Sequence, residues 1–419
     1  MRTLQSIKAE GRTTATPEEQ QILSRFVGWG QFQALFNYAD HSWNKEREVF
    51  RDLVGGHGTP EWDSAQRSTT NAHYTHPDVV KAHWRIAQRL GFDGGRYLET
   101  SAGIGYYLGM MPPELAGKTK TTAIEREKTT GEMLKHLYPN AVVKVQGFED
   151  HKPPKDFYDL IASNVPFGET KVHDPEYNKH RANIHDYFFL KSATHLRPGG
   201  LMMHITSTGT LNKPDSKIRA ELAKTCDLVS AIRFPGDTHK ENAGTSVVTD
   251  MLILRKRLPG EQPGNMDWLE TTTVPDPAGG EPIPTNKHFV NNPHLVLGTP
   301  DRTGKMRQAG MPNVSKTDDY EQRLEAAIQS LPEGVFTKAS KTVPQRAYTP
   351  IADDGKKHKN GAFVIQDGKL HVKEGDSLIP KATDPKTVEK VAGHMQIRDA
   401  VRGVINAQIE GEIGRASCR

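Results

Sequence analysis

One short stretch of the sequence restricts what this chain can fold into more than any other. The apolar run 158–162 reads as a short buried strand, and Ser163-Asn164-Val165-Pro166-Phe167-Gly168 follows it directly. A strand that ends in a small polar residue, then an Asn, then a turn containing Pro places one carboxamide at the strand's C-terminal edge. In open α/β sheets this edge is where ligands bind. The stretch therefore predicts a ligand site built around Asn164.

The composition sets limits on the class of protein. The 419 residues, 35% hydrophobic and 25% charged, allow two or three domains, one of them large enough for a full doubly wound sheet. The sequence has neither a run of 18 apolar residues nor a signal-peptide pattern, so we expect a cytoplasmic protein with no membrane partner. Cys226 and Cys418 are the only cysteines, which argues against a disulfide framework or a zinc cluster. The net charge of +4 permits nucleic acid as a partner without the footprint of a strongly basic binder.

The order of the expected elements indicates the architecture. Strands and helices alternate from residue 94 to 257, which predicts a doubly wound α/β domain. A helical region precedes it: Thr16-Pro17-Glu18-Glu19 has the form of a helix start, Gly28-Trp29-Gly30 interrupts the helix, and 55–70 reads as a loop. We favour a core role for Trp29 over one that faces DNA, because buried aromatic residues are the commoner case.

A glycine-rich turn follows the first expected strand. The sequence Glu99-Thr100-Ser101-Ala102-Gly103-Ile104-Gly105 leads from that strand into a helix that begins near Tyr106. Glycines at such a turn let the backbone approach a ligand closely. A second strand, 121–125, ends in Glu125 about twenty residues further on, where a carboxylate can accept both hydroxyls of a ribose. The alternative for Glu125 is a solvated residue at a strand end.

Three of these elements resemble one enzyme family. Asn164–Phe167 resembles the Asn-Pro-Pro-Phe/Tyr signature of amino-group methyltransferases, chiefly DNA N6-adenine methyltransferases, with Val165 in place of the first Pro. The glycine-rich turn resembles the family's Glu-Pro-Ser-Ala-Gly-x-Gly loop, with Thr100 in the Pro position. Tyr74-Thr75-His76-Pro77 is similar to the Tyr-Thr-Pro-Pro-like element that contacts the methionine carboxylate of the family's cofactor.

The resemblance implies a Rossmann-like fold of S-adenosylmethionine-dependent methyltransferases, with a closing antiparallel hairpin that the pattern itself does not show. It implies S-adenosyl-L-methionine as cofactor and no metal. The loop that contains Phe148 and Glu149 lies where relatives contact the cofactor's adenine, and which acid takes the adenine amino group stays open. The implied catalytic residues are Asn164, Val165, Pro166 and Phe167, and the implied cofactor-binding residues are Tyr74, Thr75, Glu99, Ser101, Ala102, Gly103, Gly105, Glu125, Phe148, Glu149 and Asn164.

A narrower resemblance covers residues 71–257. This part resembles the methylase of phage and plasmid helicase–methylase fusion proteins, which are linked to protection against restriction in a bacterial host. The segments Phe-Val-Gly-Trp-Gly at 26–30 and Ile-His-Asp-Tyr-Phe-Phe at 184–189 look like that subgroup too. The resemblance implies a helicase region later in a longer protein and a connector over 286–411. The tail 412–419 looks like translated sequencing adapter, so we expect Cys418 not to be native.

The remaining segments complete the expected organisation. Residues 259–285 read as a linker or extended segment, and helices are expected over 318–331 and 384–410. Residues 362–372 predict a β-hairpin, because Asp-Gly lies between two apolar runs. We find no catalytic constellation here, and Gly298 to Lys305 lacks the spacing of a phosphate loop. The expected domains are a helical region 1–70, a catalytic domain 71–257, a linker 258–317, an α+β connector 318–411 and the tail 412–419.

The resulting hypothesis is methyl transfer to the N6 amine of adenine in DNA after base flipping. The long loop 169–183 that follows the Asn164 motif is either a DNA-contacting segment or a plain surface loop. Two alternatives to the main hypothesis stay open. One is a catalytically silent DNA-binding or anti-restriction module that keeps the fold. The other is methylation of another planar amine, in cytosine N4, RNA or a protein glutamine side chain.

Overall fold

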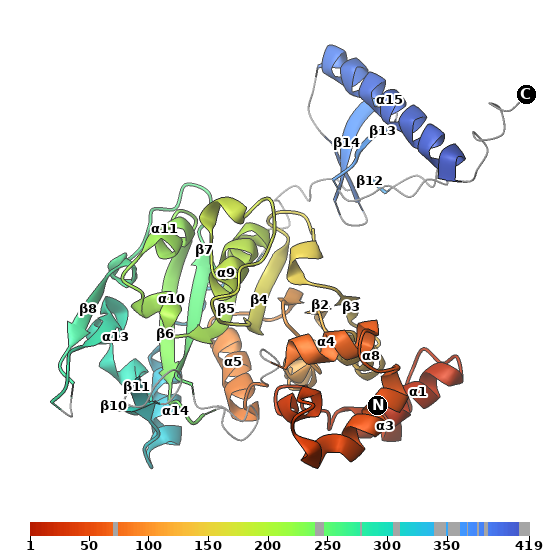
Figure 1. Cartoon of the computed structure of the whole chain (residues 1–419). Coiled ribbons are helices and arrows are strands. Elements are labelled where there is room, and N and C mark those ends of the chain that lie inside the picture. Colours follow the sequence, from red (N-terminus) through yellow and green to blue (C-terminus); the bar gives the residue numbers. More distant parts are fainter. Residues whose placement is uncertain are drawn as a thin grey trace, which may run out of the picture. The chain divides into compact units, whose positions relative to one another are not determined.

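The computed structural model divides into two compact units, of which unit 1 comprises Met1–His151 and Lys155–Ala339, and unit 2 comprises Lys152–Pro154 and Ser340–Arg419. Each unit is described by itself (Figure 1). In the part of the chain that the structure describes, no helix is both long and apolar enough to cross a membrane. The described residues are 1–69, 74–238, 247–276, 279–304, 311–338, 349–350, 361–366, 368–374, 377–380 and 384–409.

A seven-stranded sheet in the order β3-β2-β1-β4-β5-β7-β6 forms the centre of unit 1. Strands β1 to β5 pair in parallel, whereas β7 is antiparallel to both β5 and β6. The doubly wound α/β fold is therefore confirmed, and β6 and β7 form the closing antiparallel hairpin. The strand order reverses between β1 and β4. The strands are β1 (Gly95–Glu99), β2 (Thr119–Glu125), β3 (Val142–Val145), β4 (Tyr158–Asn164), β5 (Leu196–Ser207), β6 (Cys226–Phe234) and β7 (Thr249–Lys256).

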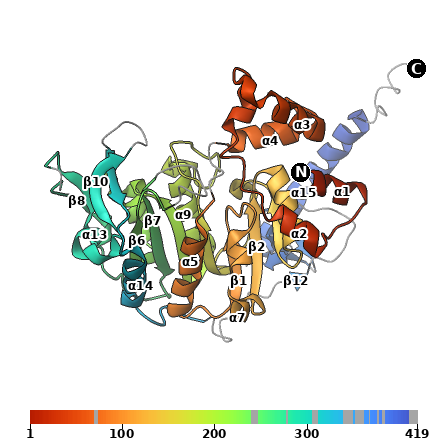
Figure 2. The ribbon, with the colours of Figure 1, turned by 90° about the horizontal axis from the view of Figure 1, so that it is seen from below.

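Helices cover both faces of this sheet (Figures 1 and 2). On one face α5 packs against β1, where the rings of Trp84 and Tyr97 lie 5.3 Å apart. On the other face α9 packs against β5, where Phe189 lies 5.1 Å from His204. The central strands are apolar almost throughout because they are buried on both sides. The helices of this part are α5 (Pro77–Arg89), α6 (Tyr106–Gly109), α7 (Pro113–Ala116), α8 (Lys128–Leu137), α9 (Ile184–His195), α10 (Gly209–Asn212) and α11 (Lys217–Ala223).

The N-terminal region is helical, as expected, with one error in the prediction. The side chains of Thr16 and Glu19 form a capping box at the start of α2. The loop expected over 55–70 is wrong, because α4 begins inside it. Thr59 caps α4 and Pro60 occupies its first turn, the same start signal that begins α2. The helices are α1 (Arg2–Ala9), α2 (Pro17–Leu23), α3 (Asn44–Val54) and α4 (Pro60–Ser68).

Trp29 is a core residue of this region and is only 4% exposed. Its ring packs against the rings of Phe26 and Phe50, at centroid distances of 5.2 and 5.0 Å. Its Nε1 donates a hydrogen bond of 3.0 Å to Oε2 of Glu127, which caps the N-terminus of α8. The core role of Trp29 is confirmed, and the view that its ring faces DNA is wrong. The indole joins the N-terminal helices to the α/β domain.

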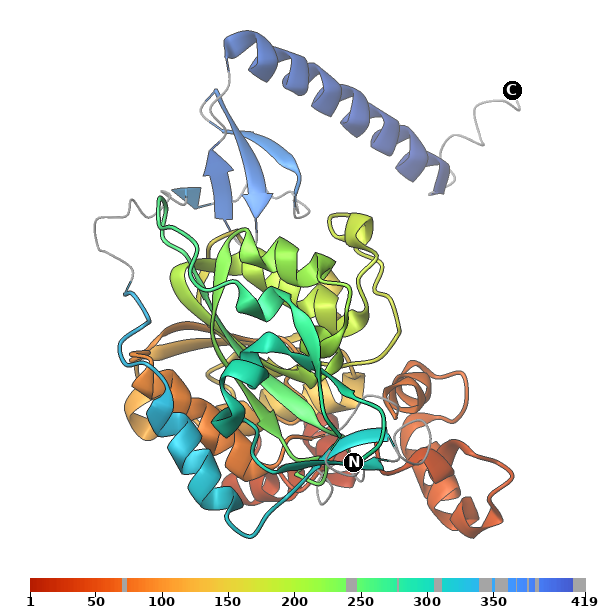
Figure 3. The same cartoon turned by 90° about the vertical axis from the view of Figure 1, so that its left-hand side faces the viewer.

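The part of unit 1 after β7, up to Ala339, contains further elements. Two hairpins occur here, and Nδ2 of Asn286 donates to the carbonyls of Leu211 and Trp268. Helix α14 lies beside α5 (Figure 3), and Arg89 donates to the carbonyl of Leu331. The segment expected as a linker thus contains ordered elements, whereas the predicted domain boundaries stay a prediction. The elements are β8 (Thr271–Val274), β9 (Ile283–Asn286), α13 (Lys287–Asn291), β10 (Thr299–Gly304), β11 (Met311–Ser315) and α14 (Tyr320–Ser330).

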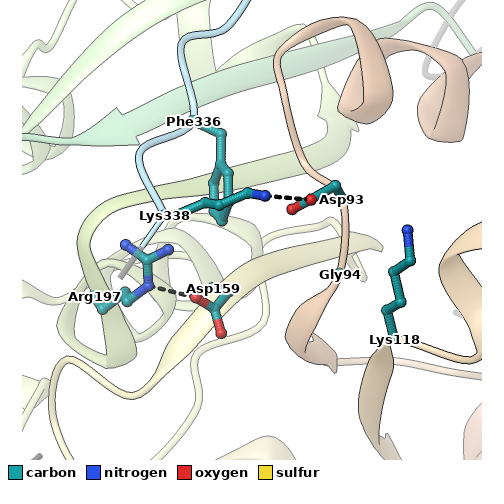
Figure 4. Close-up of a pocket in the computed structure, with 7 residues that line it drawn as sticks. All are labelled: Asp93, Gly94, Lys118, Asp159, Arg197, Phe336 and Lys338. Atoms are coloured by element: carbon teal, nitrogen blue, oxygen red, sulfur yellow. Dashed lines mark hydrogen bonds and ion pairs between the residues drawn. The ribbon is translucent and has the colours of Figure 1, made fainter. Parts of the chain in front are cut away.

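Residues 334–338 cross the N-terminal edge of the sheet, opposite the edge where β4 ends. Phe336 N donates to Leu90 O at 2.7 Å, and Thr337 N donates to Gly199 O at 3.0 Å. The segment borders a hollow of about 190 Å³ (Figure 4), lined by Asp93, Gly94, Lys118, Asp159, Arg197, Phe336 and Lys338. In this hollow Arg197 pairs with Asp159 and Lys338 pairs with Asp93. These ion pairs fasten the strand ends and the crossing segment to each other.

Unit 2 contains a four-stranded antiparallel sheet and a helix, α15 (Pro385–Ile409). The expected hairpin is confirmed, because Phe363 pairs with Val372 and Gln366 with Lys369 in an antiparallel ladder. The expected C-terminal helix is confirmed as well, and α15 contacts β13. The tail 412–419, with Cys418, lies outside the described residues. The strands are β12 (Thr349–Pro350), β13 (Phe363–Gln366), β14 (Lys369–Glu374) and β15 (Ser377–Pro380).

Replacing Trp29 by Phe is expected to lower the free energy of unfolding of unit 1 by about 2–4 kcal/mol, because it removes buried ring volume and a hydrogen bond to a carboxylate. Urea unfolding followed by circular dichroism measures the change. The matched control is Ile22→Ala in α2, where the side chain is exposed. Equal midpoints for Trp29→Phe and Ile22→Ala would contradict the assigned role of the indole.

Candidate active site

The strand order reverses between β1 and β4, and in open α/β sheets the C-terminal edge at such a reversal is the place where ligands bind. The glycine-rich loop leaves β1 at this point, and the Asn164 motif leaves β4 beside it. Ser101 joins the two: its Oγ lies 2.9 Å from Ser163 Oγ and donates a 2.8 Å hydrogen bond to Asn164 O. One hydroxyl thereby fixes the glycine-rich loop against the strand that carries the candidate carboxamide.

The glycines of the loop have conformations and neighbours that require the absence of a side chain. Gly103 and Gly105 have φ angles of +54° and +87°, in the left-handed region. A Cβ on Gly103 would lie 2.7 Å from Cε1 of Tyr74, so the Tyr74 ring packs directly on the loop. A Cβ on Gly105 would overlap the ring of Tyr138. Ala102 N donates to Ile124 O at 2.8 Å, which ties the loop to β2.

Glu125 ends β2 and turns back toward the loop. Its Oε2 accepts a 2.7 Å hydrogen bond from Gly103 N, and its Oε1 accepts a 2.7 Å hydrogen bond from Glu127 N. Burial raises the pKa of Glu125 from its ordinary value of 4.5 to about 7, against these two hydrogen bonds and with help from the charge of Glu127. Each oxygen keeps a second lone pair, so the carboxylate can still accept hydroxyl groups from a ligand.

Glu99, at the end of β1, is 1% exposed and its Oε2 has no hydrogen-bond partner. Burial, and then the charge of Glu125, raises the pKa of Glu99 well above its ordinary value. Thr100, next in the chain, also has a buried hydroxyl without a partner. Glu99 and Thr100, at the start of the glycine-rich loop, therefore each keep a polar atom that could still form a hydrogen bond.

The Asn164 motif is held by its backbone while its side chain keeps an unused acceptor. Val165 N donates to Ile205 O at 3.1 Å, and the Val165 side chain is buried in the core. The Oδ1 of Asn164 is buried and has no hydrogen-bond partner. A buried acceptor without a partner costs free energy, which a donor on a ligand would recover. Pro166 and Phe167 follow at intermediate exposure, so the Phe167 ring is partly accessible.

Among the remaining predicted residues, Phe148 and Thr75 have buried side chains. Phe148 is 2% exposed and packs 4.9 Å from Phe188 of α9, in the core rather than on the loop surface. The Glu149 carboxylate folds back over Gly147. Thr75 is buried directly before α5. The structure thus brings Tyr74, Ser101, Gly103, Glu125 and Asn164 together at the C-terminal edge of the sheet. The roles of Phe148 and Glu149 in ligand binding stay predictions.

Two structural partners of this site had no assigned role in the sequence analysis. Ser163 completes the link through Ser101, and its small polar side chain at the strand end was the only signal. Glu127 accepts hydrogen bonds from the backbone of Thr129 and Thr130, from the Thr130 hydroxyl and from Trp29. Because Glu is not a preferred N-cap residue, the sequence carried no signal for this role.

The raised pKa of Glu125 predicts how stability depends on pH. The folded state holds a proton that the unfolded chain releases near pH 4.5, so the stability this proton confers is complete below pH 4.5 and is lost as the pH rises through about 7. Wild-type protein should therefore lose stability relative to Glu125→Gln over this window. Unfolding midpoints at pH 4.5, 5.5, 6.5 and 7.5 measure the difference, with the exposed Glu61→Gln as control. Parallel curves for wild type and Glu125→Gln would show that Glu125 does not titrate in this range.

Comparisons with known proteins give only remote similarity. No protein-family model and no curated protein matches the chain. Among solved structures, the chain is similar to a type I restriction-modification system methyltransferase subunit from Streptococcus thermophilus, at 16% identity and a TM-score of 0.43 over 66% of this chain and 59% of that one. It is similar to the modification subunit assigned to a type I restriction enzyme of Vibrio vulnificus YJ016, at 17% identity and a TM-score of 0.39 over 59% and 51%. A third similar structure is a protein from Listeria monocytogenes assigned to the class I S-adenosylmethionine-dependent methyltransferases, at 16% identity and a TM-score of 0.36 over 46% and 64%. The chain thus spans between 51% and 64% of the length of these structures, and the function has to be argued from the site itself.

Proposed function

We propose that the chain is an S-adenosylmethionine-dependent methyltransferase that methylates the exocyclic N6 amine of adenine in DNA. The observation that carries the proposal is the Asn164 carboxamide: Asn164 ends β4 at the reversal of strand order, its backbone carbonyl accepts a hydrogen bond from Ser101, and its side-chain Oδ1 is a buried acceptor with no partner. An amine that donates to this oxygen would satisfy it. The motif that contains it resembles that of amino-group methyltransferases.

The residues of the candidate site fit S-adenosylmethionine as cofactor. The cofactor carries an ammonium group and two ribose hydroxyls, all of them donors, and the candidate site offers the acceptors of Glu99, Glu125 and Asn164. Glu125 is proposed to hold the ribose, since its carboxylate lies 2.7 Å from the amide nitrogen of the glycine-rich loop. Tyr74 and Thr75, before the positive end of α5, are proposed to hold the methionine carboxylate. When bound, the cofactor supplies a methyl group activated by its sulfonium.

The proposed role of the Asn164 motif follows from the chemistry of the substrate. The lone pair of an adenine amine is delocalised into the ring, so the nitrogen is a poor nucleophile. Two acceptors placed out of the ring plane, Asn164 Oδ1 and the carbonyl of Val165, would favour a tetrahedral nitrogen whose lone pair points at the methyl group. Phe167 would stack on the base after it leaves the duplex. Transfer would break the bond between the sulfonium sulfur and the methyl carbon as the nitrogen bonds to that carbon; the cofactor would leave as a neutral thioether, and the amine would release one proton to solvent.

The substrate and the biological setting are part of the same proposal. DNA is the proposed partner, and a helicase region is proposed to follow in a longer protein. The proposed setting is a phage or plasmid whose product protects DNA from restriction in the cytoplasm of a bacterial host. Support for this comes from the segments at 26–30 and 184–189, which resemble helicase–methylase fusion proteins.

Replacing Asn164 by Ala is expected to lower the rate of methyl transfer at least about 100-fold, because one preorganised acceptor for the amine is lost. The measurement is transfer of labelled methyl from S-adenosylmethionine to unmethylated duplex DNA, followed by nucleoside analysis. Label in N6-methyladenine with wild type, and its absence with Asn164→Ala, would support the reaction and the role of the residue.

The matched control is Asn265→Ala at an exposed Asn outside the site, which should transfer methyl at the wild-type rate. Label in cytosine, in RNA or in protein would replace adenine by that substrate. Wild-type protein that binds no cofactor and transfers no methyl would contradict the proposal and favour a silent DNA-binding module.

A further inference from the structure

Lys191 and Asp174 form a buried ion pair that is not part of the candidate site. Lys191, in the middle of α9, and Asp174, in the loop 169–183, are 0% and 1% exposed. The Nζ of Lys191 lies 3.0 Å from Oδ2 of Asp174. It also donates to the hydroxyl of Tyr187 at 3.1 Å and to the carbonyl of Glu149 at 3.1 Å. Each of the three ammonium protons therefore has an acceptor.

These contacts join three segments that are separate in the sequence. Asp174 belongs to the loop that continues from Phe167, and its carboxylate also accepts a 2.8 Å hydrogen bond from Tyr187. Glu149 belongs to the loop after β3, in which the Phe148 ring lies 5.0 Å from the Lys191 ammonium. One ammonium group thus contacts the loop on the proposed substrate side and the loop on the proposed adenine side of the cofactor.

The loop 169–183 is correspondingly well anchored. Within it the carbonyl of Asp174 accepts hydrogen bonds of 2.9 Å from Tyr177 N and Asn178 N, and the Tyr177 side chain is buried. The Tyr177 ring packs 5.6 Å from that of Tyr187. Lys171, Lys179 and Arg181, by contrast, are exposed. The loop therefore has a buried side, fastened to α9, and a basic side that is accessible.

Stability alone is a poor explanation for such a pair. The desolvation of two charges offsets most of their attraction, so apolar replacement of a buried ion pair is often neutral or stabilising. What the pair does provide is geometry: an ammonium group with three specific acceptors fixes the relative positions of the segments that bear them.

We propose that Lys191 and Asp174 are positioning residues, which hold the loop 169–183 and the loop after β3 in the arrangement that methyl transfer requires. The inference rests on the proposed function. It assigns the ion pair a role in cofactor affinity and turnover, although neither side chain touches the cofactor or the base.

The test compares Lys191→Met with the double variant Lys191→Met/Asp174→Asn. The single variant removes the ammonium partner of a buried carboxylate, and we expect a large fall in its thermal midpoint. The double variant removes both charges and keeps an acceptor for Tyr187, so we expect it to regain most of the midpoint. It should nevertheless show at least a fivefold higher KM for S-adenosylmethionine and a tenfold lower kcat, with tenfold faster tryptic cleavage after Lys171, Lys179 or Arg181.

The matched control is Lys155→Met. Lys155 forms an exposed ion pair of 3.3 Å with Glu176 in the same loop, and exposed pairs contribute little. It should keep the wild-type KM, kcat and cleavage rate. A double variant with a recovered midpoint and wild-type kinetics and cleavage would overturn the inference while the proposed function stands. Wild-type protein that neither binds cofactor nor transfers methyl would overturn the proposed function, and with it the catalytic role of the pair.

Discussion

The hydroxyl group of Ser101 makes the contact on which the geometry of the candidate site depends. It lies where the strand order of the sheet reverses, and it links the loop after β1 to the last residue of β4. The backbone of the glycine-rich loop is fixed on its other side by β2 and by the Glu125 carboxylate. Three strands therefore determine where the loop lies, and the backbone of Asn164 is positioned by the same contacts. The architecture explains why residues far apart in the sequence meet at one edge.

Three glutamates at this edge of the sheet influence one another electrostatically. Glu99 ends β1, Glu125 ends β2 and Glu127 caps α8, and the three carboxyl groups differ in their hydrogen-bond partners. Glu127 is satisfied by four donors, Glu125 by two backbone amides, and Glu99 Oε2 by none. Burial and mutual repulsion raise the pKa of Glu125 and that of Glu99. A cationic ligand bound beside Glu125 would lower the pKa of that carboxyl group.

The sequence predicted the local parts of the structure well. The starts of α2 and α5, the strands β1 and β2 and the glycine-rich turn follow from short patterns that lie within one element or its flanks. The link from Ser101 to Asn164 spans 63 residues, and no local pattern reveals it. The ion pair of Lys191 was missed for a related reason, because a lysine in a helix ordinarily indicates an exposed position. The Pro, Gly and Thr content of residues 258–317 predicts a linker or extended segment, whereas the packing of this segment against β6 and α10 depends on contacts made far along the chain.

The docking of the N-terminal helices has a consequence for how such a protein can be assembled from parts. Leu4, Ile7 and Leu23 share an apolar cluster with Ile104 of the glycine-rich loop and Met133 of α8. The start of α8 is capped by the same carboxylate that binds Trp29. Cutting the chain between the helices and the sheet would expose this cluster and leave a buried glutamate short of a donor. Recombination that exchanges the α/β domain between related genes would therefore have to carry the first sixty residues along with it.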